Sequence, residues 1–259
     1  MTGGPAVLLS VDSGLATITL NRPDAKNRLD AESMALLLGH LRATADDPQV
    51  RVVVLTGSGT TFCSGADLSG ALAATSGGFA SGGTAGLVDV LVTMLDHPKP
   101  LIARVQGHVA GGGNGLVAAC DIAVASEDAK FAFSEVRVGV APAIISVVCL
   151  QVMHRRDAQE LLLTGERVSA ERVRTSGLVT RVVEAGALDA AVAVYVEQLC
   201  LGGPEAVART KELLRRVPAM TREEAFAWTA EVSAGLFTST EAREGMTAFI
   251  EKRRPAWAP

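Results

Sequence analysis

The sequence predicts an α/β protein with a helical C-terminal region. Short apolar segments rich in β-branched residues alternate with segments of helical periodicity through the first two thirds of the 259 residues. Such alternation is typical of a sheet built from strand and helix units. Only helical patterns remain near the end of the chain. We therefore expect a core at residues 1–200 and a helical region at residues 201–259.

Local signals justify the elements of the first part of the chain. A turn at residues 12–14, Asp-Ser-Gly, separates two apolar segments and indicates a hairpin. Asp30 is a suitable N-cap for the helical spacing that follows it, and Pro98 ends the next helical segment. In chain order, we expect strands at 6–11 and 15–20, a helix at 31–47, a buried strand at 51–57 and a helix at 87–96.

The later elements follow from the same kinds of signal. Apolar runs rich in Val, Ile and Phe predict further strands, and most of the chain after Pro142 has helical spacing. Residues 71–86 are low in complexity and rich in Ala, Gly, Ser and Thr, which fits either a solvated loop or a lid over a site. The expected strands are at 101–107, 121–125, 130–133 and 178–184, with a helix after the glycines at 111–115.

Composition excludes several classes of protein. The net charge of −4 and an aromatic content of 4% argue against nucleic acid as a partner. No apolar run reaches the length of a membrane span, and the N-terminus lacks the basic flank of a signal peptide. The four cysteines have no metal-ligand spacing. We expect a cytoplasmic protein with no metal, no membrane partner and no nucleic-acid partner.

The segment HVAGGGNGLVAAC at residues 108–120 is the strongest local signal. Residues 113–118 match the dinucleotide fingerprint G-x-G-x-x-A, with Glu135 about 20 residues further on. Two features disfavour that interpretation: the glycines begin several residues after the predicted strand, and the cluster lies in mid-chain. A purely structural alternative is that the glycines allow tight packing of helices and strands.

An oxyanion hole explains the glycines better. A helix N-terminus presents unpaired N–H groups, and glycine lets a substrate oxygen approach them. Such donors stabilise negative charge that develops during a reaction. A second glycine-bearing segment, FCSGADL at residues 62–68, follows the strand at 51–57 and supplies a second donor.

Five segments together resemble the enoyl-CoA hydratase/isomerase, or crotonase, superfamily. In family order they are NRPDAKNRL, FCSGADL, GHVAGGGNGLVAACDIAVA, FAFSEVRVGVAP and EGMTAFIEKRR, and they span nearly the whole chain. The resemblance implies a spiral of ββα units followed by helices that build trimers, often paired into hexamers. It also implies acyl-CoA thioester substrates of fatty-acid and lipid metabolism. No cofactor is expected, because CoA is part of the substrate.

The resemblance also assigns roles to residues. It implies that the N–H groups of Ala66 and Gly112 hold the thioester oxygen and that Glu135 is the catalytic acid. Gly115 falls where hydratases have their other glutamate. Phe249 and Lys252 would contact the adenine end, from the same or a neighbouring subunit. The implied CoA-binding residues are Ala25, Lys26, Arg28, Ser64, Gly65, Asp67, Leu68, Phe249 and Lys252.

Gly115 leaves the reaction open. We expect a hydro-lyase that adds water to a 2-enoyl-CoA, with Glu135 serving both as base and as acid. An isomerase that moves a double bond needs only one carboxylate and is the alternative. A non-catalytic acyl-CoA binding protein is the alternative of another class. Acyl length, pathway, and the choice between trimer and hexamer are not encoded in recognisable motifs.

Overall fold

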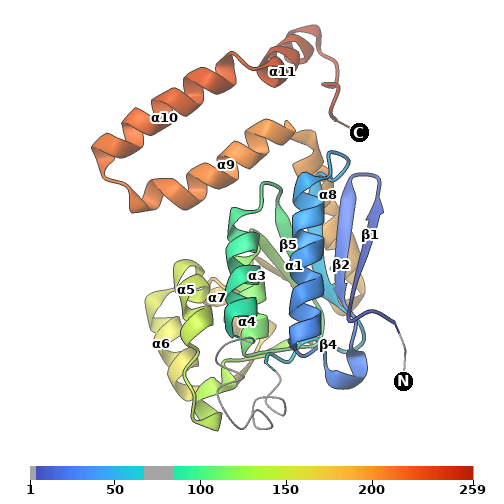
Figure 1. Cartoon of the computed structure of the whole chain (residues 1–259), viewed down its shortest axis with the longest axis vertical. Helices are drawn as coiled ribbons and strands as arrows, with labels where there is room; N and C mark the ends of the chain where they lie inside the picture. Colours follow the sequence, from blue (N-terminus) through green and yellow to red (C-terminus); the bar gives the residue numbers. More distant parts are fainter. Residues whose placement is uncertain (1–3, 67–83, 259) are drawn as a thin grey trace.

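The computed structural model describes residues 4–66 and 84–258, which form two β-sheets surrounded by helices (Figure 1). Within those residues, one sheet has six strands in the order β1-β2-β3-β5-β7-β10 and the other has four in the order β4-β6-β8-β9. The first comprises β1 Val7–Asp12, β2 Leu15–Leu20, β3 Val52–Gly57, β5 Leu101–Val105, β7 Ile122–Ser126 and β10 Arg181–Val183. The second comprises β4 Thr61–Cys63, β6 His108–Ala110, β8 Lys130–Ala132 and β9 Arg167–Ser169.

Helices connect and cover these strands. In chain order, the α-helices are α1 Ala31–Asp46, α3 Thr84–Asp96, α4 Gly112–Ala119, α5 Ala143–Val152, α6 Arg155–Thr164, α7 Ala170–Thr175, α8 Leu188–Leu201, α9 Pro204–Arg216, α10 Arg222–Phe237 and α11 Thr240–Glu251. Short 3-10 helices lie at η1 Pro23–Ala25, η3 Ser134–Val138, η4 Ala185–Ala187 and η5 Val217–Ala219.

The two sheets grow together as a spiral. Strands β3, β5 and β7 are parallel neighbours in the six-stranded sheet, and β4, β6 and β8, which follow them in sequence, are parallel neighbours in the other. Each turn of the chain therefore adds one strand to each sheet and then a helix. This arrangement confirms the predicted α/β class and the spiral of ββα units.

Burial explains why β3 reads as an uninterrupted apolar run. Its side chains alternate between two cores: Val53 and Leu55 belong to the main core, whereas Val52 and Val54 pack toward α8. Because both faces of the strand are covered, every residue of β3 is buried. Strand β2 alternates buried and partly buried positions instead.

The predicted signals at the ends of elements are confirmed. The β1–β2 hairpin pairs Asp12 with Leu15, and its two turn residues, Ser13 and Gly14, both have positive φ, as a tight hairpin requires. Asp30 caps α1 by accepting a hydrogen bond from the N–H of Ser33 at 2.8 Å, and the Ser33 hydroxyl oxygen accepts one from the N–H of Asp30. The helix therefore begins where the sequence indicated.

One element corrects the sequence analysis. The expectation that the glycines begin well after a strand is wrong, because β6 is a separate strand that ends immediately before Gly111. Gly107, with φ of +67°, lies at the bend between β5 and β6. Strand β6 takes the chain from one sheet into the other, and the glycine cluster follows at the C-terminal end of this strand.

The helices after Leu201 extend away from the sheets (Figure 1). Lys211 of α9 forms an ion pair with Asp121 at 2.7 Å, and the same carboxylate accepts a hydrogen bond from the N–H of Leu101. Glu241 of α11 accepts hydrogen bonds from the first-turn N–H groups of α9 at 2.8 and 2.9 Å. The first contact attaches α9 to the core of the same chain, and the second attaches α11 to α9. Its separation as a second domain stays a prediction.

In the described part of the chain, no single helix is both long enough and apolar enough to cross a membrane.

Candidate active site

A cavity of about 410 Å³ lies where α4 begins. Its walls come from α1, α3, the loop before residue 67, the N-terminus of α4 and the segment from η3 to α5. Most of the lining side chains are apolar. The described lining residues are Leu29, Met34, Ser64, Ala66, Leu87, Gly111, Gly112, Ser134, Glu135, Val138, Val140, Ala141, Pro142, Ala143, Ile144 and Ile145. The three residues expected to do chemistry, Ala66, Gly112 and Glu135, all line this one cavity.

The two glycine-bearing segments meet at the cavity. Gly65 has φ of +86°, and a β-carbon on it would lie 2.9 Å from the carbonyl oxygen of Ala110 and 3.1 Å from the nitrogen of Gly112. Only glycine adopts this backbone conformation while allowing so close an approach. The peptide before Ala66 is thereby held beside the first peptide of α4.

Local hydrogen bonding directs the N–H of Ala66. Leu29 forms an isolated parallel bridge with Ala66, in which the N–H of Leu29 donates to the carbonyl of Gly65 at 2.8 Å. In a parallel bridge of this register, the bonds use the groups on either side of Ala66. The N–H of Ala66 therefore faces away from Leu29.

The second donor stands at a helix start. Gly112 is the first residue of α4, so no carbonyl lies one turn earlier within the helix for its N–H. Gly111, the N-cap, has φ of +51°. A β-carbon there would lie 3.7 Å from Oε1 of Glu135. The helix N-terminus adds partial positive charge at the place where an oxyanion would bind.

Glu135 is the only ionisable side chain among the described lining residues of the cavity. It lies in the first turn of η3, two residues after the buried Phe133. Burial raises the pKa of Glu135 above its ordinary value, and a hydrogen bond from its own main-chain N–H offsets part of that rise. Oε2 is buried and has no hydrogen-bond partner among the described residues. The carboxyl group is thus free to exchange a proton with a substrate.

The position of the missing acid is filled. A β-carbon on Gly115 would lie 2.6 Å from Cγ2 of Ile145 and 3.1 Å from its Cβ. Ile145, on α5, is 2% exposed and lines the cavity, whereas Gly115 does not. At the position where the resemblance places the other acid of hydratases, an isoleucine from another helix therefore occupies the space.

This contact predicts a coupled effect on stability. Gly115→Ala forces Ile145 to move and should lower the free energy of unfolding by about 1–3 kcal/mol through overpacking. Ile145→Ala removes buried volume and should cost about 2–5 kcal/mol. The double variant should be more stable than the sum of these losses by about 0.5–3 kcal/mol, because the smaller residue 145 makes room for the added methyl group. Urea unfolding of the four proteins measures this coupling, and strict additivity would contradict it.

The other glycines of the cluster serve packing. A β-carbon on Gly113 would lie 2.8 Å from the carbonyl oxygen of Cys63 and 2.9 Å from its Cβ. Helix α4 therefore packs directly on β4. Among the helical glycines of this cluster, only Gly112 fits the expectation that glycine exposes the backbone to a ligand. Close packing, the alternative explanation, accounts for Gly113 and Gly115.

The loop at residues 21–29, NRPDAKNRL, is fixed to the segment that leads to Ala66. The carbonyl of Lys26 accepts a hydrogen bond from the N–H of Ser64 at 3.0 Å. Lys26 and Asn27 both have positive φ, and the Asn27 side chain holds this conformation with bonds to the carbonyls of Ser58 and Thr61. Asn27 is a positioning residue that the sequence analysis missed, because a buried asparagine in a polar loop leaves no periodic signal.

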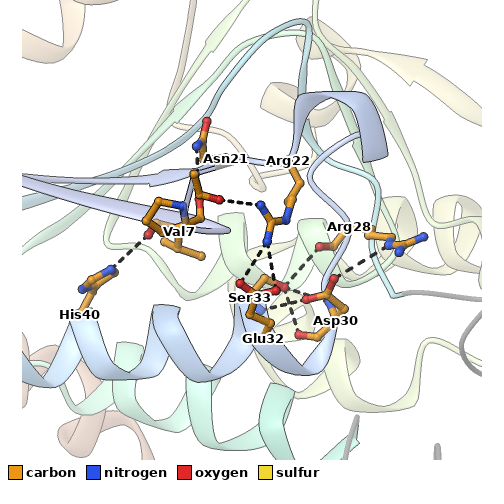
Figure 2. A network of polar contacts seen from close by, with 10 residues as sticks. Val7, Asn21, Arg22, Arg28, Asp30, Glu32, Ser33 and His40 are labelled. Atoms are coloured by element: carbon orange, nitrogen blue, oxygen red, sulfur yellow. Dashed lines mark hydrogen bonds and ion pairs between the residues drawn. The ribbon is translucent and has the colours of Figure 1, made fainter. Parts of the chain in front are cut away.

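Figure 2 shows how the same loop is attached to α1. The Arg22 guanidinium donates to both carboxylate oxygens of Glu32, and Asp30 and Ser33 form their reciprocal cap beside it. Nε of Arg28 lies 4.0 Å from Oδ2 of Asp30. Lys26 is exposed, and Ala25 and Arg28 are half-buried. The loop therefore carries two cationic residues close in sequence to Leu29, which lines the cavity.

The remaining predicted residues divide into two groups. Asp67 and Leu68, with most of the candidate lid at 71–86, lie outside the described residues. Phe249 and Lys252 lie at α11, which Figure 1 places at the far end of the molecule from α4 and β4. Within one chain, the structure therefore does not bring these two residues to the cavity.

Residues 138–145 are the other part of the site that sequence reasoning missed. Seven of these eight residues line the cavity, including Ile145. The sequence analysis places residues 138–142 only in the segment that carries Glu135 and the residues after Pro142 only in a helix. Their apolar character does not mark them as cavity residues, because it is equally typical of an ordinary core segment.

The cavity brings two main-chain segments, at Ala66 and Gly112, together with one buried carboxyl group, at Glu135. Such an arrangement suits a class of enzyme in which peptide N–H groups stabilise an anionic oxygen and a carboxyl group moves a proton. Comparison with known proteins identifies that class. Residues 10–259 match the family model described as enoyl-CoA hydratase/isomerase.

Individual relatives resemble the whole chain. Enoyl-CoA hydratase EchA19 of Mycobacterium tuberculosis is 34% identical over 256 residues, covering 97% of this chain and 96% of its own length. Carnitinyl-CoA dehydratase of Salmonella enteritidis PT4 is 35% identical over 260 residues, covering 96% and 97%. The crystal structure of an enoyl-CoA hydratase from Mycobacterium smegmatis superimposes with a TM-score of 0.93 at 39% identity, covering 98% and 99%.

The chain belongs to the enoyl-CoA hydratase/isomerase family, whose members act on acyl-CoA substrates. The predicted family and the predicted crotonase fold are confirmed.

Proposed function

We propose that this protein is an enoyl-CoA hydratase that adds water to a 2-enoyl-CoA through an enolate. The observation that carries the proposal is that Ala66, Gly112 and Glu135 line one cavity. The relatives named hydratase or dehydratase support the same reaction type.

A single carboxylate can perform both proton transfers. Glu135 takes a proton from water while the water oxygen bonds to the β-carbon of the substrate. The π electrons move toward the thioester, and the N–H groups of Ala66 and Gly112 hold the resulting negative oxygen. Glu135 then gives the proton to the α-carbon, which restores the carboxylate. The Gly115–Ile145 contact leaves Glu135 to do both jobs.

Double-bond isomerisation is the second candidate, and Ile145 favours it. An apolar side chain where hydratases have an acid provides no second group to hold water. Glu135 would remove a proton from the α-carbon of a 3-enoyl-CoA and return it to the γ-carbon. The enolate is held by the same two N–H groups.

Product analysis with matched 2-enoyl-CoA and 3-enoyl-CoA substrates tests the proposal. A 3-hydroxyacyl-CoA product from the 2-enoyl substrate supports the hydratase. Double-bond migration without hydration would replace it with the isomerase. Saturable binding of acyl-CoA without turnover of either substrate would indicate that the protein is a non-catalytic acyl-CoA binding protein.

The dependence of activity on pH should follow the protonation state of Glu135. Because the carboxylate form must accept the first proton, kcat/KM should fall with acid as Glu135 becomes protonated. Burial raises the pKa of Glu135, so the midpoint of this decline should lie at a higher pH than that of an ordinary glutamate. A profile measured under saturating and limiting substrate checks this, and a midpoint at or below the ordinary value would contradict it.

We also propose that the protein assembles into a homotrimer or a dimer of trimers. The helices after Leu201 expose large apolar side chains, and Phe249 and Ile250 of α11 are 85% and 78% exposed. Water-exposed apolar groups of this size are typical of surfaces that a second copy covers. Such an assembly would let Phe249 and Lys252 approach the CoA site of a neighbouring subunit.

Light scattering coupled to gel filtration tests the assembly. The wild type should elute as a trimer or hexamer, and Phe249→Ser should shift it toward smaller species. Val11→Ser, at an exposed apolar position on β1, is the control and should leave the mass unchanged. A monomeric wild type would contradict the proposal. The cytoplasmic location, the absence of a cofactor and the absence of nucleic-acid or membrane partners stay predictions.

A further inference from the structure

One wall of the cavity is a continuous apolar segment. Residues 138–145, with the sequence VGVAPAII, have no polar side chain, and all but Gly139 line the cavity. We call this segment the apolar wall. Leu29 from the loop before α1, Met34 from α1 and Leu87 from α3 also line the cavity. Hydrocarbon groups therefore surround the space beside the reacting carboxyl group.

Ile145 ends the apolar wall where α5 packs against α4. Its Cγ2 takes the space that any side chain on residue 115 would need. At the position where the resemblance places the other acid of hydratases, this chain therefore has a branched aliphatic group. Ile145 is held in place by the core, since it is 2% exposed and belongs to the main hydrophobic cluster.

Polar groups are few around the described cavity. Among the described lining residues, the polar side chains are Ser64, Ser134 and Glu135. A charged substituent on an acyl group would lose its water here, and the carboxyl group of Glu135 is already committed to proton transfer. Burying a charge without a partner is costly, whereas burying hydrocarbon is favourable.

We propose that Ile145, at the end of the apolar wall, is a specificity-determining residue that selects uncharged hydrocarbon acyl groups and rejects acyl groups with a charged substituent. This inference rests on the proposed acyl-CoA function. It goes beyond that function because neither the oxyanion donors nor Glu135 distinguishes one acyl chain from another.

Two saturated thioesters of matched shape test the inference by binding alone. 5,5-Dimethylhexanoyl-CoA and 4-(trimethylammonio)butanoyl-CoA differ in a single atom, a quaternary carbon in place of a quaternary nitrogen. Isothermal titration calorimetry with the full-length protein should give a dissociation constant at least about fivefold lower for the neutral thioester. Any smaller preference, or a preference for the cation, overturns the inference.

Variants of Ile145 assign the preference to that residue. Ile145→Val keeps a branched aliphatic side chain and should keep the preference. Ile145→Thr has the shape of the valine variant but adds a hydroxyl group, and should reduce the preference by about twofold or more through weaker binding of the neutral thioester. Equal preferences in the two variants would show that Ile145 does not determine the selection of the acyl group. Melting curves establish that both variants fold.

The outcomes separate the inference from the proposed function. If neither thioester binds more tightly than free CoA, the proposed acyl-CoA function fails and the inference fails with it. If both bind tightly with equal affinity, the proposed function stands and only the selection by Ile145 is overturned.

Discussion

Glu135→Gln is expected to lower kcat by about 10³–10⁴-fold, toward the upper end of the loss from one acid or base. Glutamine keeps the shape of the side chain but can neither accept nor return a proton. Since no other ionisable side chain is among the described lining residues, none of them can replace it. Steady-state assays with the preferred enoyl-CoA substrate measure the loss. Glu127→Gln, at an exposed glutamate, is the control and should be fully active.

The same variant separates catalysis from stability. Burial raises the pKa of Glu135, so the folded protein binds this proton more tightly than the unfolded chain does. The stabilising effect of protonation is complete below the unfolded-state pKa and is lost as the pH rises through the folded-state pKa. Glu135→Gln should therefore match or exceed the wild type in melting temperature at neutral pH. An inactive variant that also unfolds easily, or one with wild-type kcat, would contradict the assignment of Glu135.

Signals that act over a few residues could be read from the sequence. The N-cap at Asp30, the turn at Ser13-Gly14 and the apolar run of β3 all depend on neighbours close in the chain, and all three are present in the structure. The four-stranded sheet was not predicted as a sheet. Its strands have three residues each, too few to show periodicity, and their pairing joins segments far apart in sequence.

The site shows the same division. The order of the motifs predicted that Ala66, Gly112 and Glu135 lie together, because the spiral stacks successive turns of the chain side by side. The occupant of the space beside Gly115 could not be foreseen in this way. Ile145 comes from a helix 30 residues further along the chain, and only the packing of α5 against α4 brings it there. A missing side chain in a motif is therefore weak evidence for an empty site.

Gly65→Ala is expected to remove most activity by disturbing both oxyanion donors at once. The added β-carbon would lie 2.9 Å from the carbonyl oxygen of Ala110 and 3.1 Å from the nitrogen of Gly112. Both contacts are with main chain, which cannot rotate away as a side chain would. The loop before residue 67 must then move from the start of α4. Loss of one well-placed donor lowers kcat by about 10²–10³-fold, and we expect at least this effect.

A matched glycine separates this effect from backbone strain. Gly14, in the β1–β2 turn, has φ of +85°, almost the same as the +86° of Gly65. A β-carbon on Gly14 meets the flexible side chain of Arg51, with its nearest atom at 3.3 Å. Gly14→Ala should therefore lose stability to the positive φ, by about 1–2 kcal/mol, while keeping its kcat. Gly65→Ala should lose kcat as well. If the two variants showed equal kcat, the convergence of the peptides at Ala66 and Gly112 would have no part in the reaction, and the cavity would have to stabilise the thioester oxygen by other groups.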